Sequence, residues 1–171
     1  MLGIVPLPGT PPGASYNPDS RSETLTLTDY RQMAQTAQDK ALANALGKAG
    51  LRQIYQRSFS GAINGAYASV FLFRDEAGAT TAFRLLQKSL SRPGSVDQRV
   101  TAVDADALGA EAWGARVKGA SSDAGILLWR HGNVVVVADM TCDDTCEFDV
   151  NEAVRAFADE IDELIKQTAS S

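Results

Sequence analysis

The residues best suited to chemistry in this chain are two cysteines, Cys142 and Cys146, which are separated by three residues. This spacing leaves three interpretations open: a local disulfide, half of a metal site, or two free thiols. A zinc site as a rule needs four ligands, and the sequence has one histidine, His131, and no second cysteine pair. The Cys-x-x-Cys redox motif has a shorter spacing. We therefore predict a structural disulfide between Cys142 and Cys146, which would form in an oxidising compartment.

The sequence offers no recognisable catalytic centre. A Ser-His-Asp hydrolase would need His131 as its base, yet this residue precedes Gly132 in a segment predicted to be a solvent-facing hairpin tip. The nucleophile-elbow, metalloprotease-helix, Walker-loop and dinucleotide-binding motifs are missing from the sequence. Asp104, Asp106 and Glu111 lie close together in sequence, but nothing predicts a buried partner for acid–base work. We therefore predict a protein without enzymatic activity and without a cofactor.

Four acids surround the second cysteine: Asp143, Asp144, Glu147 and Asp149. Carboxylate oxygens are the ligands that calcium prefers, but the spacing of these acids matches no EF-hand loop. Negative charge is also favourable at the N-terminus of a helix. The preferred interpretation is therefore a solvated loop followed by Asp149 as a helix cap, and no metal site is predicted.

A tight turn sets the expected register of the last two strands. If His131-Gly132 is a two-residue hairpin loop, Arg130 pairs with Asn133. Trp129 then lies opposite Val134, because antiparallel strands pair residue by residue outward from the turn.

The same reasoning, applied to a symmetric loop over residues 119–123, places Trp113 opposite Trp129. One face of the sheet would then carry a row of Trp113, Trp129 and Val134. Paired tryptophans on a sheet are most often core residues beneath a helix. The functional alternative is the wall of an apolar ligand pocket, with Arg116 or Arg130 at its rim to orient a polar group.

The periodicity of the apolar residues predicts the elements that would position these side chains. Three- and four-residue spacing predicts helices from Asp29 to near Gly50, over residues 75–90, and from a cap at Asp149 towards the end. Strands are predicted over residues 51–58, 66–73, 99–103, 112–118, 124–130 and 133–140. The order α-β-β-α-(β)-β-β-β-α indicates an α+β fold, with helices packed on a single antiparallel sheet of five to six strands.

The N-terminal segment has a different composition. Five of the six prolines fall within its first twenty residues. Proline fixes φ and cannot continue a helix or a strand ladder, so residues 1–26 are predicted to form a proline-rich extended tether. Residues 27–171 are predicted to form a single α+β domain. Such a tether suits a mature exported protein, and a frayed cytoplasmic N-terminus is the alternative.

Composition narrows the classes of partner. The chain has 171 residues, 44% of them hydrophobic, and 16 Lys and Arg against 21 Asp and Glu give a net charge of −5. This balance repels phosphate backbones, and no stretch of sequence concentrates Lys or Arg, so nucleic-acid binding is not expected. No apolar run approaches the length of about 20 residues that crosses a bilayer, so the chain is not expected to span a membrane.

Several segments resemble small exported lipoproteins of high-GC bacteria, of the LpqN type and of the type that forms the extracytoplasmic sensors of protein kinases. The segments are residues 45–51 leading into Tyr55 and Arg57, residues 108–112, and residues 129–135. The resemblance implies an antiparallel sheet with flanking helices and a binding or sensing role outside the cytoplasm. Sensor-type domains commonly carry two longer-range disulfides, whereas this chain can form one short bridge.

Together these observations lead to two functional hypotheses. The first is a non-catalytic extracytoplasmic domain of an envelope-anchored bacterial protein that binds a small apolar ligand or a partner protein. The second is a cytoplasmic structural subunit whose sheet is completed by homodimerisation. The second hypothesis arises because residues 134–137 are all valine, so that both faces of that strand need cover.

Overall fold

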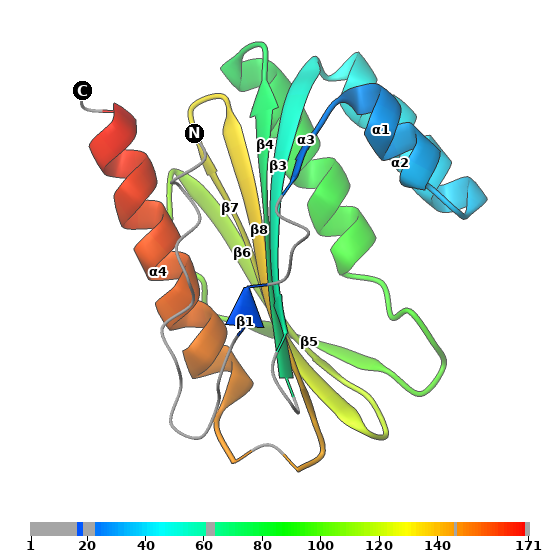
Figure 1. The fold of residues 1–171 in the computed structure, drawn as a ribbon, viewed down its shortest axis with the longest axis vertical. Coiled ribbons are helices and arrows are strands. Elements are labelled where there is room, and N and C mark those ends of the chain that lie inside the picture. Colours follow the sequence, from blue (N-terminus) through cyan, green and yellow to red (C-terminus); the bar gives the residue numbers. More distant parts are fainter. Residues whose placement is uncertain (1–16, 19–22, 61–63, 146, 170–171) are drawn as a thin grey trace.

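A single antiparallel sheet stands between two layers of helices (Figure 1). The computed structural model describes residues 17–18, 23–60, 64–145 and 147–169. Helix α4 (Val150–Ala169) lies against one face of the sheet. Helices α1 (Leu27–Met33), α2 (Ala37–Lys48) and α3 (Glu76–Leu90) lie on the other. The predicted α+β fold with one antiparallel sheet is therefore confirmed.

The sheet has eight strands within the described residues, and seven of them follow the order β1-β3-β4-β8-β7-β6-β5. The strands that the prediction lacked are β1 and β2, which both pair with β3 and come from the segment expected to be a tether. Leu25 of β2 is buried, so the packed part of the chain begins before residue 27. The strands are β1 (Asn17–Pro18), β2 (Glu23–Leu25), β3 (Leu51–Ser60), β4 (Asn64–Phe73), β5 (Arg99–Val103), β6 (Glu111–Lys118), β7 (Ser122–His131) and β8 (Val134–Asp143).

The first predicted helix is in fact two helices, α1 (Leu27–Met33) and α2 (Ala37–Lys48). Thr36 has an extended backbone and caps α2, with its hydroxyl accepting from the backbone N–H of Asp39. The Asp39 carboxylate accepts in return from the backbone N–H of Thr36. This reciprocal capping box starts a new helix inside the apolar pattern. Thr26 and Asp29 form the same box at α1, so Asp29 is the third helical residue and not the cap.

The other two helices begin where the sequence predicts. Asp75 caps α3 (Glu76–Leu90) by accepting from the backbone N–H of Gly78. Asp149 accepts from the backbone N–H groups of Asn151 and Glu152 at the start of α4 (Val150–Ala169). None of the helices in the described part of the chain combines the length and apolarity that crossing a bilayer needs.

Alternation along the strands supplies a separate core to each face of the sheet. In β4, Ala68 and Val70 belong to the cluster packed with α4, whereas Phe71 and Phe73 belong to the cluster packed with α3. The valine run of β8 divides in the same way, with Val136 on the α4 face and its neighbours on the α3 face. The chain's own helices therefore cover both faces of this run. The homodimer hypothesis arose from the need for such cover, which the helices meet.

The turn between β7 and β8 lies one residue later than expected, which moves each strand partner by two residues. The turn between β7 and β8 consists of Gly132 and Asn133, so His131 pairs with Val134 and Trp129 pairs with Val136. Gly132 has a φ of +50°, and glycine readily adopts this left-handed conformation in a tight hairpin turn.

The register of β6 with β7 also differs from the expected one, here by one residue. Ala112, and not Trp113, lies opposite Trp129, and Trp113 lies opposite Leu128. The two tryptophans therefore project from opposite faces of the sheet, because neighbouring residues of a strand alternate between faces.

Candidate functional site

A cavity of about 190 Å³ lies between the sheet and the layer formed by α1, α2 and α3. Its polar wall comes from the sheet and the end of α3, and its apolar wall comes mostly from the helices. We call it the Asp139 cavity. The polar residues are Gln56, Tyr67, Ser69, Ser89 and Asp139, and the other lining residues are Tyr30, Leu42, Phe71, Leu86, Leu90 and Val137.

Strand register brings the polar side chains together. Tyr67 of β4 pairs directly with Asp139 of β8, and Ser69 of β4 pairs directly with Gln56 of β3. Tyr67 and Ser69 are two residues apart on one strand, so they share a face. Helix α3 ends at Leu90, which lines the cavity. The polar patch therefore lies where the helical cover of the apolar sheet face comes to an end.

Two of these polar residues are buried, and Tyr67, Ser89 and Asp139 are half-buried. Ser69 is 2% exposed and Gln56 is 7% exposed. The Ser69 hydroxyl donates to the Tyr67 hydroxyl oxygen over 2.9 Å. Burial raises the pKa of Tyr67 from its ordinary value of 10 to about 12, with Asp139 contributing through the repulsion between two negative charges.

Asp139 is the unusual member of the group. Burial raises the pKa of its carboxyl from 3.8 to about 7, because ionisation is unfavourable away from water. Within the described residues, no donor is hydrogen-bonded to this carboxyl, and no lysine or arginine lines the cavity. A titratable group with a displaced pKa in the wall of a cavity is a common feature of functional sites.

Aromatic rings from α1 and β4 also line the cavity. Tyr30 of α1 meets Phe71 of β4 edge to face, with ring centroids 6.2 Å apart and an angle of 88° between the rings. This arrangement fixes the position of α1 over the sheet next to the cavity. The Asp139 cavity thus combines an apolar, aromatic lining with a small number of converging polar groups, which is the usual composition of a small-molecule site.

The tryptophan row expected from the sequence does not form. Trp129 is fully buried in the core on the α4 face, and Val134 packs against that same core. Trp113 packs against the core on the α3 face. The expected pocket wall on one face is wrong because the register of β6 with β7 is shifted by one residue, which places Trp113 on the other face.

Arg130, one of the two arginines expected at a pocket rim, is buried instead. It donates to Glu76 of α3 at 2.9 Å and to Glu111 of β6 at 3.5 Å. Arg130 therefore links the hairpin end of β7 to α3.

Arg116 is also held by acids. It forms an ion pair with Asp123 across β6 and β7, and its guanidinium lies 3.8 Å from Asp149. The paired Arg116 guanidinium lowers the pKa of Asp123 below its usual value. Neither arginine lines the Asp139 cavity.

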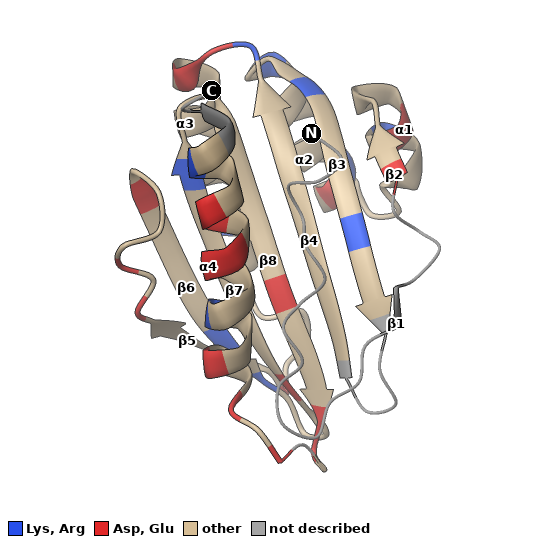
Figure 2. Cartoon of the chain, turned by 60° about the vertical axis from the view of Figure 1, so that its left-hand side comes forward, with Lys and Arg blue, Asp and Glu red and all other residues tan. Residues whose placement is uncertain are grey.

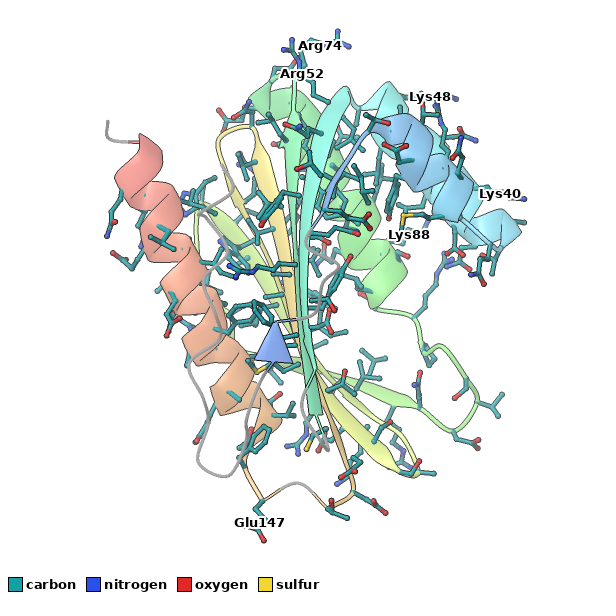
Figure 3. The ribbon with its side chains drawn as sticks, in the orientation of Figure 1. Lys40, Lys48, Arg52, Arg74, Lys88 and Glu147 are labelled. Atoms are coloured by element: carbon teal, nitrogen blue, oxygen red, sulfur yellow. The ribbon has the colours of Figure 1, made fainter. Side chains whose placement is uncertain are left out.

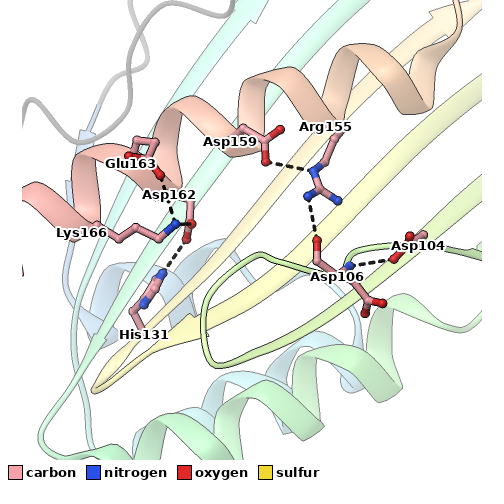
Figure 4. Close-up of polar contacts among 8 residues, drawn as sticks. All are labelled: Asp104, Asp106, His131, Arg155, Asp159, Asp162, Glu163 and Lys166. Carbon is pink, nitrogen blue, oxygen red and sulfur yellow. Dashed lines mark hydrogen bonds and ion pairs between the residues drawn. The ribbon is translucent and has the colours of Figure 1, made fainter.

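His131 is held by α4 rather than directed into solvent (Figure 4). Its Nε2 lies 2.5 Å from the carboxylate of Asp162, and the ammonium of Lys166 lies 2.8 Å from the same carboxylate. Asp162 is buried, so the interaction joins the tip of the β7–β8 hairpin to the helix. No Ser, Thr or Cys side chain within the described residues is hydrogen-bonded to His131, so this pair lacks the nucleophile that a catalytic triad would need.

The acids between β5 and β6 have structural contacts as well. The Asp104 carboxylate accepts from the backbone N–H of Asp106, and the backbone carbonyl of Asp106 accepts from Arg155 of α4 over 2.7 Å (Figure 4). Among the described residues, no group of three or more acids, histidines or cysteines is arranged to hold a metal ion.

Cys142 lies at the end of β8 and is 1% exposed. The described residues contain no free thiol. Cys146 lies outside the described residues, and the disulfide between the two cysteines stays a prediction.

Sequence reasoning did not find the Asp139 cavity. In the sequence, Asp139 is a single acid that interrupts an apolar run over residues 134–140. The available signal was the alternation itself, because Asp139 falls on the same face of β8 as Val135 and Val137. An acid at an inward-facing strand position is unusual, since buried carboxylates are rare without a partner.

Comparisons with known proteins identify the fold. No family model and no curated protein matches this chain. It is similar to the crystal structure of the extracellular domain of PknH from Mycobacterium tuberculosis, with a TM-score of 0.56 and 12% identity over 89% of this chain and 86% of that one. A putative uncharacterised protein from Mycobacterium smegmatis, an Rv0999 ortholog, gives a TM-score of 0.44 and 11% identity over 94% and 89% of the two chains. The similarity to the PknH domain agrees, at the level of fold, with the expected resemblance to kinase sensor domains.

Proposed function

We propose that this chain is a non-catalytic extracytoplasmic domain of a bacterial envelope protein, and that it binds a small, mainly apolar ligand in the Asp139 cavity. The observation that carries the proposal is the cavity itself, with its apolar lining and a half-buried carboxyl group that no described residue pairs with. The fold shared with the extracellular domain of PknH supports the proposed location and the proposed absence of catalysis.

The size of the cavity limits the ligand. A cavity of about 190 Å³ is comparable to apolar cavities of about 150 Å³ that accept a benzene-sized molecule. We therefore expect a ligand with one ring or a short branched chain. Contact with Leu42, Leu86 and Phe71 would remove its apolar surface from water, and the polar wall would orient its head group.

The binding proposal is tested by amide chemical shifts during a titration with benzyl alcohol. We expect saturable shifts at the residues that line the cavity. Ser89→Phe places a large ring at the cavity wall from α3 and should abolish these shifts. Ser95→Phe, which makes the same change at an exposed position between α3 and β5, should leave them intact. Shifts that are absent in the unmodified protein, or that persist in Ser89→Phe, would contradict the proposal.

The export part of the proposal includes the Cys142–Cys146 disulfide. A buried cysteine beside a turn, in a chain with two cysteines, suits a short bridge formed outside the cytoplasm. Intact mass after alkylation under denaturing, non-reducing conditions should show no added label. Two labels on protein that was never reduced would contradict the disulfide. They would also contradict the inference from it that the protein lies outside the cytoplasm.

A further inference from the structure

The lining of the Asp139 cavity has a distinctive composition. Tyr30, Tyr67 and Phe71 contribute aromatic rings from α1 and β4, and Asp139 contributes a carboxyl group from β8. Among the described residues, Asp139 is the one ionisable acid or base in the wall apart from the two tyrosines. A carboxylate beside aromatic rings is an arrangement that favours cations, because the negative face of each ring attracts positive charge.

No lysine or arginine in the described part of the chain is paired with this carboxylate. Burial is the one cause of its displaced pKa, so no neighbouring lysine or arginine offsets the loss of water. Figure 3 shows Lys40, Lys48, Arg52 and Arg74 along the outer side of α2 and at the top of the sheet. Such exposed cations are screened by salt over distances of about 8 Å.

We propose that the ligand of the Asp139 cavity is a small organic cation, an ammonium group carried on an apolar body of about one ring. This inference rests on the proposed ligand-binding function. The ammonium would place its charge against the Asp139 carboxylate and over the neighbouring rings, and its apolar body would fill the space beside Leu42 and Leu86. An anionic head group would be repelled by the carboxylate, and a neutral one would leave that charge unpaired.

Three ligands of nearly equal size separate these cases: benzylammonium, benzyl alcohol and benzoate. Their affinities are measured by calorimetry at pH 8, where most of the Asp139 carboxyl is ionised. We expect benzylammonium to bind about tenfold more tightly than benzyl alcohol, and benzoate to bind most weakly. This comparison needs no substitution, so it does not depend on the folding of a variant.

The variant Asp139→Asn then tests whether Asp139 causes the preference for benzylammonium. It keeps the shape of the side chain and should reduce the affinity for benzylammonium to that for benzyl alcohol. Asp97→Asn, the same change at an exposed position outside the cavity, should keep the preference for the cation.

The outcomes separate the inference from the proposed function. Equal or tighter binding of benzyl alcohol would overturn the cation inference and leave ligand binding standing. A preference for benzylammonium that survives in Asp139→Asn would also overturn it. If none of the three ligands binds, both the inference and the proposed function fail.

Discussion

Asp139 connects the stability of this protein to its proposed binding role. A carboxyl group without a partner in a buried position costs free energy when it ionises. In the folded protein burial raises its pKa to about 7, whereas the unfolded chain has the ordinary value of 3.8. The strand position is thus poorly suited to stability alone, which is typical of residues kept for function.

Stability should therefore depend on pH through this residue. Between pH 3.8 and about 7 the folded state holds a proton that the unfolded state releases, so the free energy of unfolding should fall as pH rises through this window. Asp139→Asn removes this fall and should be more stable than the unmodified protein above pH 7, by at most about 4 kcal/mol. Urea unfolding at pH 5 and pH 8 measures the difference.

Asp97→Asn is the matched control, because it removes one exposed carboxylate and should follow the pH dependence of the unmodified protein. A fall in stability of equal size in Asp139→Asn and in the unmodified protein would show that Asp139 is not the group responsible.

At the scale of elements, the β7–β8 hairpin depends on α4 for its position. The buried Asp162 carboxylate contacts both His131 of the hairpin and Lys166 one turn later on the helix. The nearby pair of Arg155 and Asp159 lies on the same helix, but Asp159 is 53% exposed. We expect the buried Asp162 to contribute more than Asp159 to the free energy of unfolding, because exposed ion pairs contribute little.

Asp162→Asn should therefore cost about 1–3 kcal/mol of unfolding free energy, because a buried charge-assisted contact is lost. Asp159→Asn, the same change on the exposed side of α4, should cost less than about 0.5 kcal/mol. Thermal or urea unfolding of the two variants decides the matter. Equal effects would mean that the His131–Asp162 contact does not hold the hairpin to the helix.

Close packing of α4 on the sheet depends on Gly125 of β7. A Cβ atom at this position would lie 2.7 Å from Cγ1 of Val154 and 2.9 Å from the backbone carbonyl of Val150. Gly125→Ala should therefore displace the helix and cost about 1–3 kcal/mol. Gly65→Ala in β4 should be milder, because its Cβ would meet one backbone oxygen at an ordinary 3.6 Å. Equal losses in urea unfolding would contradict this account of α4 packing.

The elements were largely predictable from the sequence, whereas their boundaries and register were not. Periodicity alone locates α3, β5 and the start of α4. It cannot detect that Thr36 begins a second helix, because the apolar spacing continues across the break. It also cannot decide between two turns one residue apart. The loop between the paired ends of β6 and β7 spans residues 119–122 rather than the expected 119–123, and this difference moves Trp129 relative to Trp113.

For the whole molecule, charge is divided between the two helical layers. Acidic residues recur along α4 (Figure 2), where Glu152, Asp159 and Glu160 are exposed. The α1–α3 layer carries exposed cations, among them Lys40 and Lys88. The net charge of −5 conceals this division, because composition records totals and not positions.

The Asp139 cavity is also a property of the whole molecule. It needs β3, β4 and β8 to bring polar residues together, and it needs α1, α2 and α3 to cover them incompletely. Each contribution comes from a different part of the chain. Single-sequence patterns describe one element at a time, so the sequence could indicate an antiparallel sheet with two covered faces but not the gap between its parts.

The central claim is that this cavity holds a small organic cation, and a crystal structure of the protein grown with benzylammonium tests it most directly. We expect the ring between Leu42 and Phe71, and the ammonium nitrogen within hydrogen-bonding distance of a carboxylate oxygen of Asp139. A cavity that is closed or holds only water at a saturating concentration of benzylammonium, with the compound bound elsewhere on the surface, would contradict the claim.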